Sequence, residues 1–539
     1  MNGLINRYRS YFEKSFVALS FLDTEGDKIK ITACLCTEND GDSINVIIDG
    51  VAHKTEFFFT KTKDLEEKKV NFNFFTVSLD KECLSSKRIS FEGLAVATFS
   101  AFPIDKRSAS FYTFNSFVMY IDNDCLAFDT ATKKVLKERK KVRKTAMRQL
   151  FKSDRGNVIK AFIMRAAHFL LSPFFKKEIW LIADRKDIAG DNGEAFFEYL
   201  CKNPQKNVKP YFVINKSSKD YKRIRAIGKV LHPRTFKYKL YYTFASKVIA
   251  SQLEYDIVNP IMAKDYLKDI TRDQKIVFLQ HGIIKDDLSP TYNRYEKPMD
   301  IFVTSTNDEY RSIALSNAYG YGEKIVKLTG LARYDKLESE GEKIIFIAPS
   351  WRKHCLKDTD TLEPIDNLEE TGFFKLYSQL LNSKELIDTA NKTGYKLCFY
   401  PHTMMKECAK RLGKLDPVFV NAGDFSYNDM FKKGALLLTD YSSIQFDFAY
   451  LKKPIIYCQP DRDEFFASHT YVPGYFDYEK NGFGPVTYSA NDAISLLCAY
   501  MENGCVIQRE YEDRIDSTFK FKDKSNCQRI LNEVLKLND

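Results

Sequence analysis

The pattern of hydrophobic and polar residues changes twice along the chain. From residue 15 to 130, short runs of β-branched and aromatic residues alternate with polar turns such as 39–42. This pattern is typical of a small antiparallel β-domain and favours a sandwich. The runs expected to form strands are 16–19, 29–35, 43–48, 55–59 and 72–77. We therefore take residues 1–135 as a β-rich accessory domain without evident chemistry.

The next segment, 136–177, is predicted to be a basic helical linker. Residues 131–177 contain 15 Lys or Arg and two acids. Six cations recur at helical spacing, so they would line one face of an amphipathic helix. Such a helix beside the apolar run 161–175 suits contact with an anionic membrane surface. The alternative is a solvated linker that packs on the next domain. The six cations are Lys137, Lys141, Lys144, Arg148, Lys152 and Arg155.

From residue 178 onward, short continuous apolar runs alternate with helical stretches. Such runs are expected of parallel strands that are covered on both faces. They fall into two blocks, which predict an α/β fold with two Rossmann-like domains facing a cleft, 178–338 and 339–539. We expect the last helix, 526–537, to end the second domain. The strand runs are 179–184, 209–214, 247–251, 275–280 and 301–305, then 343–349, 396–401, 435–440 and 454–459.

Composition agrees with a large globular protein. The chain has 539 residues, of which 44% are hydrophobic and 29% charged, enough for three domains. The net charge of +10 suits an anionic partner such as a membrane surface, a nucleotide or a polyanionic polymer. The 12 Cys are scattered and the first residues lack a secretory signal, so we expect reduced cytosolic thiols. No run reaches the ~18 apolar residues of a transmembrane helix.

The most informative stretch is 437–461. A buried strand ends in the polar turn Thr439-Asp440-Tyr441-Ser442-Ser443, and a helix over 444–451 follows. Hydroxyl groups and free backbone N–H groups at the positive end of a helix can hold a phosphate. The same residue types also cap ordinary helices, so the spacing alone leaves both interpretations open.

Two histidines follow predicted strands. His281 stands before Gly282, after the strand 275–280, and His402 follows the strand 396–401. Ligands bind at the carboxyl ends of the strands in such sheets. Imidazole titrates near neutral pH, so His281 could accept a proton from an attacking hydroxyl. The alternative for each histidine is an ordinary loop position.

Other candidates lie in loops of the two blocks. Asp191, Asn192 and Glu194 follow the first α/β strand, where they suit a hydroxylated or phosphorylated acceptor, or else a helix cap. Arg333 could meet a donor phosphate or only orient the domains. Arg352 is the better candidate for phosphate contact, because a guanidinium binds phosphate through two hydrogen bonds.

Together these motifs resemble those of the CDP-glycerol glycerophosphotransferase family, the teichoic-acid polymerases and primases. The resemblance covers about 180–535, and one departure stands out. The best-known members have Trp before the essential His and Pro-Leu-Lys after the Gly, whereas this chain has Gln280 and Ile283-Ile284-Lys285. It therefore looks like a variant branch, which leaves the choice of donor and acceptor open. The matching positions are 439–443 (TDYSS), 446–449 (FDFA), Lys453-Pro454, Asp461, His281-Gly282, His402, 329–335 and 349–352.

The resemblance implies a transferase on the GT-B plan of two Rossmann-like domains. It would move glycerol phosphate from CDP-glycerol to an acceptor hydroxyl and release CMP, in synthesis of teichoic acid or a related cell-wall or capsule polymer. His281 would be the base, and His402 would stabilise charge on the donor pyrophosphate. We expect donor contacts from Arg333, Arg352, Asp440, Tyr441, Ser442, Ser443 and Asp447, and acceptor contacts from Asp191, Asn192, Glu194 and Lys285.

We expect no metal site and no required cofactor, because preorganised donors can stabilise the transferring group, although Mg²⁺ bound with the nucleotide stays open. Expected partners are CDP-glycerol or a similar CDP-alditol, a lipid-linked or polymer acceptor and an anionic membrane surface, with self-association and no nucleic acid. The expected location is cytoplasmic, peripheral on the inner face of the plasma membrane. Four alternatives remain: a CDP-ribitol enzyme, a capsule phosphodiester-polymer transferase, a nucleotide-sugar glycosyltransferase and a non-catalytic membrane scaffold.

Overall fold

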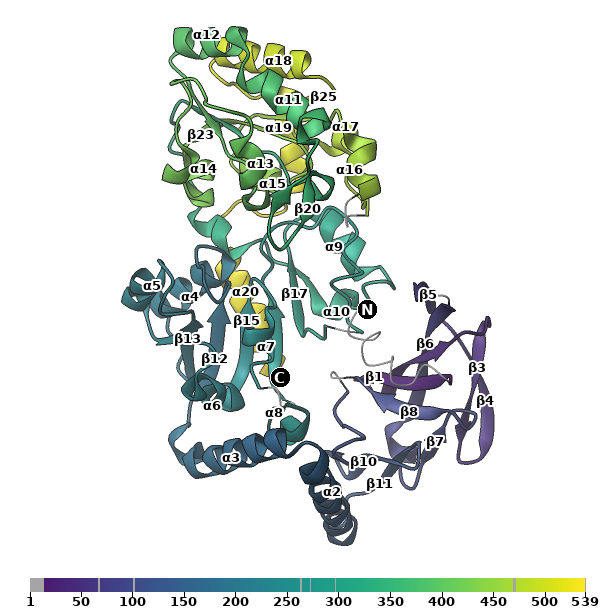
Figure 1. Cartoon of the computed structure of the whole chain (residues 1–539). Coiled ribbons are helices and arrows are strands. Elements are labelled where there is room, and N and C mark those ends of the chain that lie inside the picture. Colours follow the sequence, from purple (N-terminus) through teal and green to yellow (C-terminus); the bar gives the residue numbers. More distant parts are fainter. Residues whose placement is uncertain are drawn as a thin grey trace.

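The computed structural model describes residues 14–65, 68–99, 102–261, 264–271, 273–295, 297–468 and 472–538. These residues form a β-sandwich, two consecutive helices and two α/β units that lie one above the other (Figure 1). The predicted fold class, two parallel-sheet α/β units after an all-β region, is confirmed. The first 13 residues, on which the expectation of no secretory signal rests, lie outside this description.

Two sheets pack face to face in the N-terminal sandwich, in the orders β5-β6-β2-β1-β8 and β4-β3-β7-β11-β10-β9. Side chains from both sheets, such as Phe75 and Phe128, fill the core between them. The predicted strand 55–59 is wrong, because the chain turns at Phe57 and Phe58. The strands are β1 (Phe16–Glu25), β2 (Lys28–Thr37), β3 (Ser43–Ile48), β4 (Val51–Glu56), β5 (Phe59–Leu65), β6 (Lys68–Asp80), β7 (Arg88–Ser90), β8 (Ala95–Thr98), β9 (Tyr112–Phe114), β10 (Phe117–Asp122) and β11 (Cys125–Thr130).

The outer face of the first sheet docks on the first α/β unit. The ring of Tyr295 lies 4.0 Å from that of Phe74, centroid to centroid. Arg294 donates two hydrogen bonds to the carboxylate of Asp23, at 2.7 and 2.8 Å. Lys268, which is buried, donates to three backbone carbonyls of the segment that follows β8. The sandwich is thus attached by apolar, ionic and backbone contacts together.

Two helices connect the sandwich to the α/β units, α2 (Lys133–Ser153) and α3 (Arg155–Leu171). Asp154 separates them with φ of −141°, which is not helical. The prediction that Arg155 shares one helical face with Lys152 is therefore wrong, because the break redirects the chain. In the part of the chain that the structure describes, no helix combines the length and apolar character needed to cross a bilayer.

The first α/β unit is a seven-stranded parallel sheet in the order β14-β13-β12-β15-β16-β17-β18. The chain runs outward in both directions from β12, so the order reverses between β12 and β15, where α/β sheets bind ligands. The strands are β12 (Glu178–Ala183), β13 (Val208–Val213), β14 (Val230–Leu231), β15 (Ala245–Ala250), β16 (Lys275–Phe278), β17 (Ile301–Thr304) and β18 (Val326–Leu328). The helices are α4 (Asn192–Lys202), α5 (Tyr221–Ile227), α6 (Phe236–Phe244), α7 (Tyr255–Val258), η3 (Lys264–Leu267), α8 (Lys268–Thr271), α9 (Asn307–Ala314) and α10 (Gly322–Ile325).

The second unit is a five-stranded parallel sheet in the order β22-β19-β23-β24-β25, which reverses between β19 and β23. Its strands are β19 (Ile344–Ile347), β22 (Lys396–Phe399), β23 (Gly434–Thr439), β24 (Ile455–Cys458) and β25 (Val486–Thr487), with a separate hairpin of β20 (Leu356–Asp358) and β21 (Glu363–Pro364). The helices are α11 (Gly372–Leu381), α12 (Lys384–Thr393), α13 (Lys406–Lys410), α14 (Tyr427–Lys433), α15 (Gln445–Tyr450), α16 (Arg462–Ser468), α17 (Tyr478–Asn481), α18 (Ala490–Glu502) and α19 (Arg509–Thr518).

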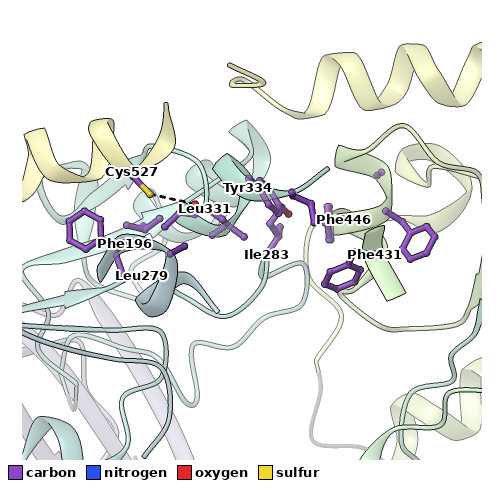
Figure 2. Packing of buried hydrophobic residues seen from close by; sticks show 14 of the residues in the cluster. Phe196, Leu279, Ile283, Leu331, Tyr334, Phe431, Phe446 and Cys527 are labelled. Carbon is purple, nitrogen blue, oxygen red and sulfur yellow. Dashed lines mark hydrogen bonds between the residues drawn. The ribbon is translucent and has the colours of Figure 1, made fainter. Parts of the chain in front are cut away.

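The last helix, α20 (Asn526–Leu535), crosses back to the first unit, contrary to the expectation that it ends the second. Its apolar side packs near Phe196, and the Cys527 thiol donates to the carbonyl of Ala332 at 3.5 Å (Figure 2). The same cluster continues into the second unit, where Tyr334, Ile283 and Phe446 lie close together in the figure. One apolar core therefore joins the two units.

Candidate active site

Loops at the carboxyl ends of the two sheets meet between the units. The carbonyl of Gly190, after β12, accepts from Asn428 Nδ2 on α14 at 3.2 Å. A Cβ atom added to Gly282, after β16, would lie 3.3 Å from Ser443 Oγ. The His-Gly loop of the first unit thus touches the Ser-Ser turn of the second. The structure brings these two predicted motifs together.

The loop that carries His281 is held from inside the first unit. Gln280 has a positive φ of 61°, an uncommon conformation for a residue with a side chain. Its Nε2 donates to Glu309 Oε1 at 3.0 Å, and the same oxygen accepts from the N–H of Ile284 at 2.7 Å. Glu309, on α9, is fully buried, and burial raises its pKa to about 7. Sequence reasoning missed Glu309, because an acid in a first helical turn usually indicates only a helix cap.

The side chain of His281 is exposed to solvent, but many protein atoms lie around it and reduce its hydration. Desolvation, followed by the charges of Arg185 and Arg333, lowers the pKa of His281 to about 4. The imidazole is therefore neutral at physiological pH, which is the form that can accept a proton.

His402 follows β22 in the second unit. Its Nδ1 accepts from the N–H of Met404 at 3.2 Å, which fixes the ring orientation and leaves Nε2 available. Desolvation, then Arg185, lowers its pKa, while Asp440 acts in the opposite direction. The two predicted catalytic histidines therefore both feel the charge of Arg185.

Arg185 is a candidate that sequence reasoning undervalued. It follows the first-unit strand β12, and its side chain is exposed. Among the described residues, the guanidinium has no hydrogen-bond or ion-pair partner. Its charge lowers the pKa of both His281 and His402 and acts on Tyr427 of α14. An unpaired cation beside two histidines is suited to an anionic ligand.

The hydroxyl turn after β23 lies as the sequence predicts. Ser442 and Ser443 are both partly exposed, and Ser442 Oγ accepts from the N–H of Ile444 at 3.4 Å. Within the described residues, the hydroxyl of Ser443 has no hydrogen-bond partner. The helix that follows, α15, has only six residues, so its dipole is short and the hydroxyl and N–H groups of the turn itself are the better anion ligands.

Asp440, Tyr441 and Arg352 form a buried network instead of facing the solvent. Arg352 is 0% exposed and donates to Asp440 at 2.8 Å and to Asp461 at 2.7 Å. Asp440 also accepts from the N–H of Ser350 at 2.9 Å, and the hydroxyl of Tyr441 donates to Asp461 at 3.1 Å. This network fixes the turn beneath the serines. A direct phosphate contact by these three residues would require it to open, and that role stays a prediction.

Arg333 and Asp447 join the two units. The guanidinium of Arg333 donates to both carboxylate oxygens of Asp447 at 2.9 and 3.0 Å. It also donates to Asp191 at 2.8 Å and to the carbonyl of His281 at 3.0 Å. Of the two roles left open for Arg333, these contacts favour orientation of the domains over contact with the donor.

The loop before α4 is organised by Asp184. Its carboxylate accepts from the N–H groups of Gly190, Asp191, Gly193 and Glu194 and from the hydroxyl of Ser251. Burial raises the pKa of Asp184 to about 6. Gly193 is required, because a Cβ atom there would lie 2.4 Å from the carbonyl oxygen of Ala183. The backbone donors at the start of this helix are thus already occupied by the protein.

Three predicted acceptor residues have internal partners. Asn192 is buried and donates to the carbonyl of Gln280 at 2.8 Å. Glu194 pairs with Arg223. Lys285 is 3% exposed and pairs with Asp286 at 2.6 Å. Their roles in acceptor binding stay predictions.

The described residues include no cluster of three His, Cys, Asp or Glu side chains that could hold a metal ion. The partly exposed groups around the site are imidazoles, hydroxyls and the guanidinium of Arg185, which favour an anionic ligand over a cation. The absence of a metal requirement stays a prediction.

Comparison with known proteins places this site in a family. The model of the CDP-glycerol:poly(glycerophosphate) glycerophosphotransferase family matches residues 163–536. The minor teichoic acid biosynthesis protein GgaB of Bacillus subtilis is 33% identical over 90% of this chain and 51% of its own length. The teichoic acid poly(ribitol-phosphate) polymerase of Bacillus spizizenii is 23% identical over 61% of this chain and 52% of its own.

The chain spans about half the length of these two relatives. The solved structure of the wall teichoic acid polymerase TagF matches 72% of this chain and 98% of its own at 15% identity and a TM-score of 0.48. The family model alone covers more than two thirds of the sequence, including both histidines and the Ser-Ser turn. The chain therefore belongs to the CDP-glycerol:poly(glycerophosphate) glycerophosphotransferase family.

Proposed function

We propose that this chain transfers an alditol phosphate, by default glycerol phosphate, from a CDP-alditol to an acceptor hydroxyl and releases CMP. The product would be teichoic acid or a related cell-surface polymer, and the acceptor a lipid-linked or polymeric chain. The observation that carries the proposal is the close approach of Gly282 to Ser443 beside a neutral His281: a Cβ atom on the glycine would lie 3.3 Å from the serine hydroxyl. Together with the family membership, this contact supports one site built from both units.

The chemistry assigns each group a distinct task. His281 takes the proton of the acceptor hydroxyl as its oxygen attacks the β-phosphorus of the donor. The new O–P bond forms while the bond from that phosphorus to the CMP oxygen breaks, and CMP leaves with the electron pair. The hydroxyls of Ser442 and Ser443 hold the pyrophosphate, and His402 and Arg185 stabilise its charge. The buried pair of Arg352 with Asp440 keeps the serine turn in place.

Binding of the donor would prepare the base. In the free protein, positive charge from Arg185 and Arg333 helps to keep His281 neutral. A bound pyrophosphate would offset those charges, so the pKa of His281 would rise toward neutral pH when a proton has to be accepted. The base would thus become stronger only after the donor is present.

The second candidate donor is CDP-ribitol. It is favoured by the relative described as a poly(ribitol-phosphate) polymerase, whereas the family model favours glycerol phosphate. Both donors share the CMP leaving group and differ only in the alditol. The residues proposed above would contact the shared part, so the alditol has to be determined by experiment.

We also propose that the protein works at the inner face of the plasma membrane. Five apolar side chains at the outer side of α3 and the turn after it are exposed, by 51–79%. Lys140 and Lys144 of α2 lie near one of them, Phe162, and the combination of apolar and basic side chains suits an anionic lipid surface. The five side chains, named here the α3 patch, are Phe162, Ile163, Phe169, Leu170 and Phe174.

The test is CMP release by the purified full chain, offered CDP-glycerol and CDP-ribitol separately with a glycerol-phosphate primer. We expect CMP from one donor, and loss of at least about 100-fold in His281→Ala, the usual contribution of a general base. His53→Ala is the matched control, because His53 lies on β4 of the sandwich. Equal CMP release by His281→Ala and wild type would overturn the assignment of the base. Release of a nucleoside diphosphate from a nucleotide sugar would overturn the reaction class.

A further inference from the structure

A cavity of about 370 Å³ lies at the elbow between α2 and α3, away from the active site. Its walls come from two turns of α2, the first half of α3 and η3. The volume falls in the range of small-molecule sites. Its surface is mostly apolar with cations at its edge: Lys140, Lys144, Met147, Val158, Phe162 and Tyr266 line it, with Arg143 and Arg165.

The cations around this cavity exceed the nearby acids. Arg143 and Arg165 both bind the carboxylate of Asp269 on α8, at 3.0 and 2.6 Å, so one negative charge is shared by two guanidinium groups. Lys140 and Lys144 are one helical turn apart and exposed. Within the described residues neither lysine has an ion-pair or hydrogen-bond partner. The cavity edge therefore carries uncompensated positive charge.

The nearest acid at the elbow is also engaged. Asp154, between the helices, accepts from the hydroxyl of Tyr266 at 2.6 Å and pairs with Arg107 at 3.6 Å. It therefore does not neutralise the two lysines. Anions would be attracted to the side of the cavity formed by α2.

The apolar wall continues onto the surface. Phe162 lines the cavity and is itself 72% exposed, and Ile163 beside it is 51% exposed. A hydrocarbon chain could thus run from the cavity along Phe162 onto the α3 patch. Apolar wall and cationic edge together match a ligand with a phosphate at one end and a hydrocarbon chain at the other.

We infer that the α2–α3 cavity binds a single anionic phospholipid, with its phosphate between Lys140 and Lys144 and its chain along Phe162. This goes beyond contact with a charged surface, because it assigns a saturable site for one lipid molecule. A nucleotide or free phosphate would leave the apolar wall without a partner, so the lipid fits better. The site is separate from the transfer reaction and does not depend on which donor is used.

The experiment is calorimetric titration of the full chain with dihexanoyl phosphatidylglycerol below its micelle concentration. We expect saturable 1:1 binding, weakened at least about 10-fold in Lys140→Ala/Lys144→Ala, which removes two charge-assisted contacts. Lys137→Ala/Lys141→Ala is the matched control, because it removes the same charge from the same helix without touching the cavity. Met147→Trp fills the cavity without a change of charge and should also abolish binding. Circular dichroism verifies that each variant is folded.

The remaining ligands and variants separate a lipid site from its alternatives. Glycerol phosphate and dihexanoyl phosphatidylcholine should not bind at the same concentrations, because the first lacks the chain and the second the net negative charge. Equal weakening in the control pair would mean diffuse attraction and overturn the site, as would unchanged affinity in Met147→Trp. Equal affinity for glycerol phosphate would overturn the lipid in favour of a free phosphate. Since this experiment measures heat of binding, a negative result would overturn the lipid site without affecting the proposed transfer reaction, which is tested by CMP release.

Discussion

Arg333 donates to both carboxylate oxygens of Asp447, at 2.9 and 3.0 Å, and this ion pair connects the segment between the α/β units to the second unit. The same guanidinium reaches Asp191 and the carbonyl of His281 in the first unit. The side chains of Arg333 and Asp447 are 10% and 3% exposed, so solvent screens their attraction little. Arg333 therefore links His281 to the FDFA segment directly, in addition to the apolar core that joins the two units.

Arg333→Ala should lower the free energy of unfolding by about 3–5 kcal/mol, because it leaves the buried carboxylate of Asp447 unpaired. The double variant Arg333→Ala/Asp447→Ala should cost less than the sum of the single variants. Urea unfolding can be followed at each unit, since the two Trp residues lie at 180 and 351, one in each. Weaker donor binding with unchanged stability would instead identify Arg333 as a donor ligand.

Glu309 should make stability depend on pH. Burial raises its pKa from 4.5 to about 7. Between these pH values the carboxyl is protonated in the folded protein and ionised in the unfolded one, because burial of the ionised form costs desolvation energy. Stability should therefore fall as pH rises from 4.5 to 7, by about 3 kcal/mol relative to the neutral Glu309→Gln. Urea unfolding of both proteins at pH 5 and pH 8 measures this difference. Parallel pH profiles would show that Glu309 is not the group responsible.

His281 should titrate far below an ordinary histidine. Its pKa is lowered to about 4 in the free protein, so an NMR titration of ¹⁵N-histidine-labelled protein should show one imidazole still neutral at pH 5. The imidazole signal that is absent from the spectrum of His281→Asn is the signal of His281. Adding CDP-glycerol should raise this pKa, because the donor charge offsets Arg185 and Arg333. A pKa near 6.5 in the free protein, or no response to donor, would contradict the proposed preparation of the base.

Arg185→Gln should weaken donor binding about 10-fold or more, the usual loss for one charge-assisted hydrogen bond to phosphate. It should also raise the pKa of His281, since it removes one of the positive charges that lower it. Arg225→Gln is the control, because Arg225 is exposed on α5 at the outer edge of the first unit (Figure 1). If Arg185→Gln changes neither the donor dissociation constant nor the titration of His281, Arg185 has only a structural role and the prediction is wrong.

The strands of the α/β units could be predicted because they are continuous apolar runs bounded by polar loops, as at 435–440. The edge strands β14, β18 and β25 were not expected, since two or three residues are too short for a pattern. The destination of α20 was predicted wrongly, because an apolar face such as Cys527, Ile530 and Val534 does not specify its partner.

The site could be predicted where a motif carries the chemistry itself. His281, His402 and Ser443 are singled out because their strand-end positions coincide with the motifs of the family, and their roles stay predictions. Arg185 is undervalued and Glu309 is missed by sequence reasoning, because an isolated arginine and a helix-capping acid are common in any sequence. The role of each depends on residues that are distant in sequence. Glu309 accepts a hydrogen bond from the backbone of Ile284, and the charge of Arg185 acts on both histidines.

The α3 patch should decide membrane attachment. Phe169, Leu170 and Phe174 are 77%, 69% and 79% exposed, and burying each in the interface would contribute about 1.5–3 kcal/mol. Phe169→Ser/Leu170→Ser/Phe174→Ser should therefore abolish co-sedimentation with vesicles containing phosphatidylglycerol, while CMP release from a water-soluble primer continues. Leu315→Ser/Val506→Ser is the control, because these exposed apolar residues lie on the α/β units. Undiminished co-sedimentation of the triple variant would mean that α3 does not enter the bilayer, and binding lost only at high salt would assign attachment to the cations of α2.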